Sequence, residues 1–395
     1  MKRFLTLIIY VTLPLLLTAQ QRELRFEQLP IDLNVNGNII TGIRQDKQGF
    51  FWISSLLNGL IKFDGYTTTK YEYAPFDPLS IPQNQIYTFL IDKDDTIWVG
   101  TPEGISRFDR RTEKFIRYNA KLIPGMPDFR NVGTINEDDD GNLWIGNYEG
   151  ELWRYNKRTG QCLSLTSRLD YTREKGAAAE FHESIYCIYK DKKGNIWIGN
   201  TNGLHRANKR PGSGNENSFT HYQHDPANAN SISHNEVLNI FEDSKGIIWV
   251  GTKFGLNSLD VSSGKITRYL PDPVNPSAIT GREVSVWGRA IIEDPDSSLW
   301  IATGDGLNKL NKERTAFTHY FQNNSASFGV LSNMITTLGT DAGNNLLVST
   351  TNGIYSLILN QKAFGLLQHD VNDINSISTN DILSVVEDKS GIVWI

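Results

Sequence analysis

The stretch Asp94-Asp95-Thr96-Ile97-Trp98-Val99-Gly100-Thr101-Pro102-Glu103-Gly104-Ile105 returns, with small changes, along almost the whole chain. When the copies are aligned on their tryptophan, successive copies lie 46 to 53 residues apart. A period of this length, with several short strand patterns in each unit, is typical of a β-propeller rather than a helical solenoid. The aligned positions are Trp52, Trp98, Trp144, Trp197, Trp249, Trp300, Leu347 and Trp394.

Each copy contains two turns that separate its strand patterns. In Asp191-Lys192-Lys193-Gly194 the carboxylate can accept backbone N–H groups of the turn, while glycine takes the positive φ angle. A second turn, as in Thr252-Lys253-Phe254-Gly255, follows the same glycine rule. We therefore expect four-stranded antiparallel blades, with their second and third strands near 50–64, 96–109, 142–155, 195–206, 247–260, 298–310 and 345–358.

Strands such as Ile97-Trp98-Val99 are apolar on consecutive residues, so both faces of each sheet must be covered. Blades packed face to face around an axis meet this requirement, with the tryptophans filling the gaps between neighbouring blades. The predicted fold is an all-β, seven-bladed β-propeller over residues 20–361. The structural tryptophans expected in its seams are Trp52, Trp98, Trp144, Trp197, Trp249 and Trp300.

The two ends of the repeat array suggest how the ring closes. Leu24-Arg25-Phe26-Glu27-Gln28-Leu29-Pro30 resembles an outermost strand but precedes the first blade, so we expect it to complete blade 7 and remove the open sheet edges. The last residues, Glu387 to Ile395, stop in the middle of an eighth copy. Residues 362–395 are accordingly predicted to begin a second propeller, with 362–368 as its closing strand, in a chain that is a fragment of a longer one.

Residues 1–19 combine two positive charges, a short apolar core and a small residue before Gln20, which is the pattern of a secretory signal peptide. The chain is therefore expected to be exported. A disulfide between Cys162 and Cys187 would be compatible with an oxidising compartment, although each is more simply a small buried residue. The net charge of −5, without any basic run, argues against nucleic acid as a partner.

Motifs with chemical meaning are mostly absent. Asn136-x-Asp138-x-Asp140-Gly141 resembles the start of a calcium loop, but Asn147 stands where a bidentate Glu is required, so we interpret it as a turn. His221-x-x-His224 has metal-like spacing in a strand end, where two exposed histidines are the simpler interpretation. Gly212-Ser213-Gly214 is interpreted as a linker. We expect no cofactor, no metal and no catalytic residue, although a catalytic acid pair inside the channel stays open.

The turns between second and third strands, and the connections from one blade to the next, should open on the same face. Loop length varies most there, at 166–184, 207–217 and 270–283, so a binding site is expected on this face. Aromatic rings and arginines suit sugar rings and uronate or sulfate groups. The alternative is that Trp287 packs between blades and that Arg289 pairs with a channel carboxylate. The candidate ligand-binding residues are Tyr148 and Phe254 on turns, and Arg282, Trp287 and Arg289, which lead into and lie within the inner strand of blade 6.

The unit Asp-x-x-Gly-x-Ile/Leu-Trp-Ile/Val-Gly-Thr-x-x-Gly-Leu, present at Asp191 to Leu204 and Asp243 to Leu256, resembles the two-component regulator propeller repeat. The resemblance covers nearly all of the chain after the signal peptide. It implies the periplasmic sensor region of a hybrid histidine kinase, with two propellers, a β-sandwich, one membrane helix and cytoplasmic phosphorelay parts beyond this chain. It further implies oligosaccharide ligands, frequent homodimers, inner-membrane anchoring of the parent protein and control of glycan-utilisation genes.

Three hypotheses follow from these patterns. The first is a non-catalytic module that senses oligosaccharides. The second is a propeller enzyme, because the repeat is similar to that of streptogramin lyases, which act through polar residues at the channel mouth. The third is a scaffold for protein interactions. The eighth copy favours the sensor, because a lyase with a single propeller would stop after blade 7.

Overall fold

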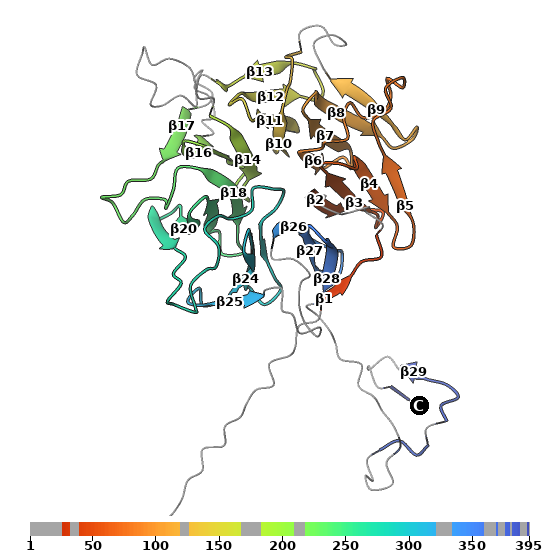
Figure 1. Ribbon diagram of the computed structural model, residues 1–395. Helices are drawn as coiled ribbons and strands as arrows, with labels where there is room; N and C mark the ends of the chain where they lie inside the picture. Colours follow the sequence, from red (N-terminus) through yellow and green to blue (C-terminus); the bar gives the residue numbers. More distant parts are fainter. Residues whose placement is uncertain are drawn as a thin grey trace, which may run out of the picture. The chain divides into compact units, whose positions relative to one another are not determined.

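The computed structural model describes residues 26–31, 39–118, 126–166, 183–208, 218–320 and 334–358, and the short stretches 369, 376–379, 381–387 and 393–394. The chain divides into two units, residues 1–359 and 360–395, which are treated separately. The described part of the first unit is a ring of seven antiparallel sheets, each with four strands (Figure 1). The all-β, seven-bladed prediction is confirmed.

Each blade runs from an inner strand at the axis to an outer strand at the rim. Blade 1 is β2 (Ile40–Gln45), β3 (Phe51–Ser55), β4 (Leu60–Phe63) and β5 (Thr68–Tyr71). Blade 2 is β6 (Thr88–Ile91), β7 (Ile97–Thr101), β8 (Gly104–Asp109) and β9 (Lys114–Tyr118). Blade 3 is β10 (Val132–Glu137), β11 (Asn142–Asn147), β12 (Leu152–Asn156) and β13 (Cys162–Ser164). Blade 4 is β14 (Ile185–Lys190), β15 (Ile196–Asn200), β16 (Gly203–Asn208) and β17 (Ser218–Tyr222).

The remaining blades repeat this order. Blade 5 is β18 (Val237–Glu242), β19 (Ile248–Thr252), β20 (Gly255–Asp260) and β21 (Lys265–Tyr269). Blade 6 is β22 (Ile291–Glu293), β23 (Leu299–Thr303), β24 (Gly306–Leu310) and β25 (Phe317–Tyr320). Blade 7 is β26 (Ile335–Thr340), β27 (Leu346–Thr350), β28 (Gly353–Leu357) and β1 (Phe26–Gln28).

The first strand closes the ring, as the sequence predicts. β1 pairs antiparallel with β28, so that Phe26 lies opposite Leu357 and Glu27 opposite Ser356. Figure 1 shows β1 at the outer end of blade 7, beside the last strand of the same unit. A blade assembled from both ends of the unit ties these ends together, so the ring cannot open between them without breaking the pairing of β1 with β28.

The turn between the first and second strands has a second role that the turn chemistry does not predict. As expected, the aspartate accepts backbone N–H groups, and Asp92 Oδ1 receives those of Asp94 and Thr96. Its other oxygen accepts the indole N–H of the tryptophan six residues later, which satisfies the one polar atom of a buried ring. This bond recurs in six blades, as Asp46–Trp52, Asp92–Trp98, Asp138–Trp144, Asp191–Trp197, Asp243–Trp249 and Asp294–Trp300.

The core lies in the seams between blades. Trp52 is fully buried and meets the Phe108 ring of blade 2 edge-on, with centroids 5.2 Å apart. In blade 7, Leu347 takes the tryptophan position and packs with Ile43 and Ile53 of blade 1. The tryptophans therefore occupy the seams, as predicted.

The remaining predictions concern the two cysteines, the second unit and segments that the structure does not describe. Cys162 and Cys187 are both free thiols. In the second unit, β29 (Val386–Glu387) and β30 (Val393–Trp394) form an antiparallel pair, and a second propeller stays a prediction. The signal peptide at 1–19, the linker at 212–214 and the closing strand at 362–368 lie outside the described residues. In the part of the chain that is described, no helix has the length and apolar character needed to cross a membrane.

Candidate functional site

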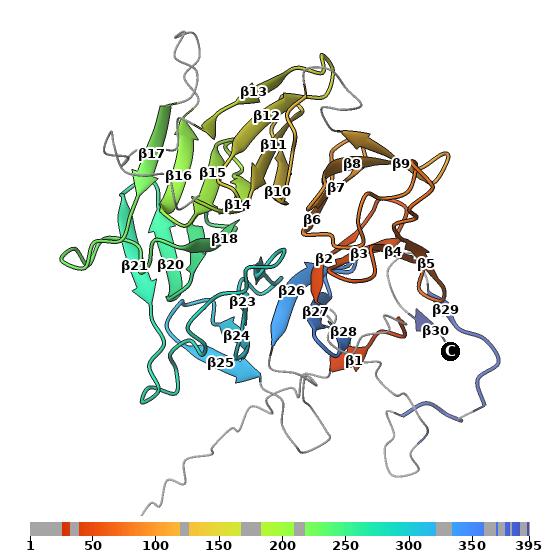
Figure 2. The ribbon, with the colours of Figure 1, turned by 45° about the horizontal axis from the view of Figure 1, so that its top comes forward.

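The inner strands surround a central cavity of about 130 Å³, which we call the channel. Figure 2 shows the inner strands β6, β10, β14 and β18 around the centre of the ring. The turns between second and third strands lie beside the connections between blades, because Gly255 donates its N–H to the carbonyl of Arg282 and Leu56 donates to that of Ile39. The turns and the connections therefore share one face, at a mouth of the channel, as predicted. The prediction is wrong for the insertion at 207–217, because it falls between β16 and β17, the third and fourth strands of blade 4, and not between two blades.

Most inner strands begin with a one-residue bulge at this mouth. In blade 5, Val237 pairs with Thr252 and Asn239 with Gly251, so that only Leu238 stands between them. In blade 6, Val284 bridges to Thr303, but the next partner, Ala302, bonds to Ala290. Residues 285–289, the blade-6 excursion, thus replace a single residue. Because a bulge re-aims side chains, the excursion points new groups into the channel.

The excursion corrects one prediction, since Trp287 and Arg289 do not lie within the inner strand, which begins at Ile291. It is held from both sides. Asn239 of blade 5 donates to the Gly288 carbonyl at 2.9 Å, and the N–H of Leu338 in blade 7 donates to the Arg289 carbonyl at 2.7 Å. Gly288 has φ of 51°, and an added Cβ would lie 2.4 Å from the Thr41 carbonyl of blade 1. Only glycine fits this close approach.

Two guanidinium groups line the channel. Arg44 comes from β2 and Arg289 from the excursion. Burial, followed by the positive charge of Arg289, lowers the pKa of Arg44 to about 9. Desolvation by the surrounding blades also lowers the pKa of Arg289, although this residue keeps an exposed surface in the open channel. None of the described residues that line the channel is Asp or Glu, so the carboxylate partner considered for Arg289 is absent from this lining.

Three tyrosines gather at the mouth, and we call them the mouth tyrosines: Tyr87, Tyr148 and Tyr186. The Tyr148 ring meets Tyr87 at 5.1 Å between centroids and Tyr186 at 6.0 Å. An added Cβ on Gly133 would lie 2.7 Å from the Tyr148 ring, so the ring fills the space that a side chain there would take. All three are half-buried, and burial raises the pKa of Tyr186 to about 12.

The other two predicted residues lie further from the axis. Phe254 is 37% exposed on its turn, and Arg282 is exposed beside it. Neither residue lines the channel. Lys253, next to Phe254, pairs with Glu236 at 3.0 Å, and Glu236 accepts the hydroxyl of Tyr186. The structure therefore brings Tyr148 and Arg289 to the channel region, while Phe254 and Arg282 form the surrounding rim; Trp287 is half-buried in the excursion.

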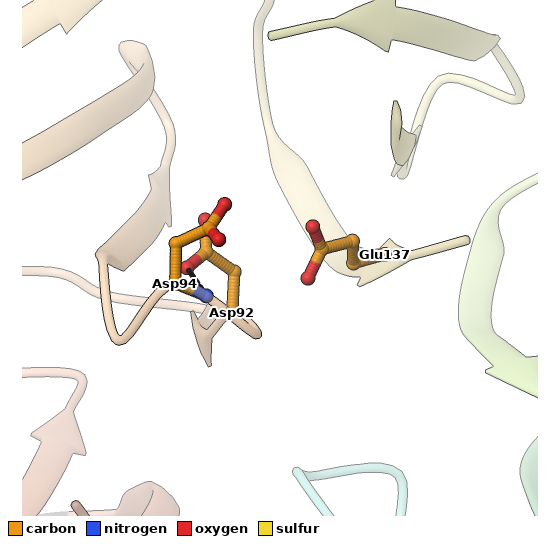
Figure 3. A group of neighbouring side chains, drawn as sticks. All are labelled: Asp92, Asp94 and Glu137. Atoms are coloured by element: carbon orange, nitrogen blue, oxygen red, sulfur yellow. Dashed lines mark hydrogen bonds between the residues drawn. The ribbon is translucent and has the colours of Figure 1, made fainter. Parts of the chain in front are cut away.

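Three carboxylates lie close together on the face with the turns between first and second strands, away from the channel mouth, and resemble a metal site. Figure 3 shows Asp92 and Asp94, on the turn between β6 and β7, facing Glu137 of β10. The ammonium group of Lys157 lies 2.7 Å from Asp92, 2.7 Å from Glu137 and 3.1 Å from Asp94. Burial alone would lower the pKa of Lys157, but these hydrogen bonds outweigh it and raise the pKa. The lysine therefore holds the position that a cation would need.

The remaining motifs are structural. Asp138 accepts the N–H groups of Asn142 and of the Trp144 indole, which fits the turn interpretation. His221 and His224 do not converge on one site, and both are half-buried rather than exposed as expected. His221 lies 2.6 Å from His205, nitrogen to nitrogen, while His224 bonds to the carbonyl of Ile232.

Comparison with known proteins identifies the same repeat in four stretches of the chain. Residues 80–103, 128–149, 180–202 and 231–254 match the family described as two component regulator propeller. Four stretches of the chain therefore carry the repeat of this family. The match falls on the aspartate turns and tryptophan strands that the structure places in blades 2 to 5.

A curated relative of this regulator propeller is histidine kinase P4 of Formosa agariphila, which is 30% identical over 336 residues, or 80% of this chain and 22% of the relative. The extracellular domain of the putative hybrid two component system BT4673 from B. thetaiotaomicron has a TM-score of 0.66 at 21% identity, over 94% of this chain and 44% of that one. The chain thus spans about a fifth of the length of the histidine kinase and less than half of the BT4673 domain.

The same fold occurs in an enzyme. A catalytically inactive histidine-to-alanine variant of virginiamycin B lyase from Staphylococcus aureus, with quinupristin, has a TM-score of 0.59 at 15% identity, over 86% of this chain and 100% of that one. At this identity the likeness concerns the fold alone. In the regulator propeller, no histidine is among the described residues that line the channel.

Sequence reasoning missed Arg44, Tyr87 and Tyr186. Tyr186 stands at the bulge of its inner strand, the position that Leu238 holds in blade 5 and Gly133 in blade 3. Tyr87 directly precedes β6 at the corresponding position, and its N–H donates to the Gly100 carbonyl. An alignment of these positions in blades 2, 3 and 4 shows Tyr, Gly and Tyr, and the glycine leaves the space that the Tyr148 ring fills between the other two. Arg44 carries no such signal, because its neighbour Arg289 is far away along the chain.

Proposed function

We propose that this regulator propeller is the exported, ligand-sensing part of a hybrid two-component histidine kinase and has no catalytic role of its own. Its similarity to histidine kinase P4 and to the extracellular domain of BT4673 supports this assignment. Kinase and phosphorelay activities would belong to parts of the parent protein outside this chain. In such a system, the ligand signals by binding one arrangement of the protein more tightly than another.

We further propose oligosaccharides as the ligand class, bound at the channel mouth. The observation that carries this proposal is the cluster of Tyr87, Tyr148 and Tyr186, whose half-buried rings present apolar faces with polar tips. Such rings combine stacking area with hydrogen-bonding hydroxyls, and the nearby Glu236 and Lys253 add polar groups that can fix orientation. The periplasm as compartment, anchoring in the inner membrane and control of glycan-utilisation genes belong to the same proposal.

A thermal-shift screen of the complete exported region against oligosaccharides tests this assignment, because a ligand that binds only the folded state raises its Tm. Tyr148→Ala removes the central ring, and Gly133→Ala displaces it without removing it. We expect an oligosaccharide that raises the Tm of the wild type to lose its effect in both variants. Tyr66→Ala is the control, because this ring is 92% exposed and lies away from the mouth.

The result that would contradict the oligosaccharide site is a Tm increase that persists in Tyr148→Ala and Gly133→Ala. Signalling is tested separately, by histidine phosphorylation of the parent kinase with and without the same oligosaccharide. The lyase alternative predicts turnover of a streptogramin by the purified chain, which the sensor assignment does not.

A further inference from the structure

We propose that the channel is an oxyanion site, in which Arg44 and Arg289 bind a single carboxylate, sulfate or phosphate group. The inference rests on the two arginines of the channel lining, whereas the oligosaccharide proposal rests on the mouth tyrosines, of which Tyr87 and Tyr186 line the same cavity.

The first observation is an uncompensated charge. Both guanidinium groups line the cavity, and neither makes a hydrogen bond or an ion pair through its side chain with any residue that the structure describes. The contact of Arg44 within the protein is with an aromatic ring, as its guanidinium carbon lies 5.9 Å from the centre of the Phe89 ring. Some other arginines of the ring have carboxylate partners: Arg110 lies 2.8 Å from Asp46 and Arg314 lies 3.2 Å from Asp243. The two channel arginines have no such partner among the described residues.

The second observation is that specific backbone contacts fix Arg289 at the channel. Arg289 reaches the channel because the blade-6 excursion replaces a one-residue bulge with five residues. Hydrogen bonds from Asn239 and Leu338, and the close contact of Gly288 with Thr41, fix the excursion against blades 5, 7 and 1. Pre-organised donors lose little freedom on binding, which favours recognition of an anion.

The third observation is the size of the cavity. About 130 Å³ is far more than the roughly 10–15 Å³ that one water requires, but less than the roughly 300 Å³ at which small-molecule pockets begin. It can therefore take a small oxyanion and not a saccharide chain. Arginine suits this task because its planar fork binds both oxygens of such a group and keeps its charge at neutral pH.

The bound oxyanion could come from either of two sources. It could be a free inorganic ion, or it could be the acidic group of a larger molecule that enters from the channel mouth. Calorimetric titration of the purified chain distinguishes them, with sodium sulfate, sodium phosphate, glucuronate, a glucuronate-containing disaccharide and its neutral counterpart. Sodium chloride keeps the ionic strength constant, because screening alone would otherwise change the signal.

We expect saturable binding of at least one of the anionic probes and none of the neutral disaccharide. Binding by sulfate or phosphate would support a free ion, and binding confined to the two glucuronate probes would support an acidic saccharide group. Arg44→Gln and Arg289→Gln should each weaken the binding by about tenfold or more, because each removes a charge-assisted hydrogen bond. Arg130→Gln is the matched control, since Arg130 is exposed and paired with Asp128.

A second readout separates binding from folding. Because Arg44 and Arg289 repel each other, either substitution should leave Tm unchanged or raise it when no oxyanion is present. A fall in Tm in the absence of oxyanion would mean that the arginines serve the fold, and would overturn the proposal. Equal binding by the wild type and both channel variants, or no binding of any anionic probe, would overturn it as well. None of these three results affects the outcome of the oligosaccharide screen with Tyr148→Ala.

Discussion

The ammonium group of Lys157 in blade 3 lies 2.7 Å from Oδ2 of Asp92 in blade 2, the same oxygen that accepts the indole N–H of Trp98. One carboxylate thus joins its own blade to the next. Equivalent links run from Arg110 to Asp46 and from Arg314 to Asp243. The recurrent aspartate is consequently a turn residue, a tryptophan anchor and an inter-blade contact.

Removal of this lysine should therefore destabilise the ring. Lys157→Met leaves Asp92, whose side chain is 1% exposed, without its cation. It leaves Glu137, which is 9% exposed, with only the more distant Lys93 ammonium at 4.0 Å. Breaking a buried pair in this way costs about 3–5 kcal/mol, to be measured by chemical denaturation. Lys190→Met is the control, because its pair with Asp139 is largely exposed and is worth about 0–1 kcal/mol. Equal losses in the two variants would refute the assignment.

The seam tryptophans make a second prediction. Trp98 is 3% exposed, so Trp98→Ala should lower the free energy of unfolding by about 3–5 kcal/mol, through lost packing and the lost indole hydrogen bond to Asp92. Tyr66→Ala, which removes a ring that is 92% exposed, should change it little. Differential scanning calorimetry gives both values, and an unchanged Tm in Trp98→Ala would contradict the seam packing.

A buried histidine predicts loss of stability in acid. His205 bonds to Asn200 and His221, and burial, with the charge of His221, lowers its pKa to about 3. In the unfolded chain its pKa is about 6.5. The unfolded state therefore binds the proton first, so this contribution is complete above about pH 6.5 and is lost as the pH falls toward 3.

Asparagine stands at the equivalent position in blades 5 and 6, as Asn257 and Asn308. His205→Asn should therefore fold, and its Tm should fall less than that of the wild type between pH 7 and pH 5. Parallel pH profiles for the two proteins would show that His205 does not titrate in this way.

The fold was largely predictable, because the tryptophan period and the glycine turns act locally and recur in each blade. The position of β1 was also predictable, since an outer-strand pattern before the first blade has only one open edge to fill. The candidate site was less so. The sequence identifies Trp287 and Arg289 as departures from the repeat but predicts them at and within the inner strand of blade 6, because periodicity cannot reveal a five-residue excursion. Arg44 and Arg289 meet only through ring closure, which brings blades 1 and 6 to a common axis.

Closure of the ring can be measured directly by a crosslink between its ends. Glu27→Cys and Ser356→Cys place two thiols on directly opposed residues of β1 and β28, in a background with Cys162→Ser and Cys187→Ala. A short thiol crosslinker should join peptides 27 and 356 within single molecules, as detected by mass spectrometry, while a Glu27→Cys and Thr267→Cys pair, with one cysteine in blade 5, should remain unlinked. If both pairs react alike, or if the 27–356 link forms only between separate molecules, the closed seven-bladed ring and its channel must be abandoned.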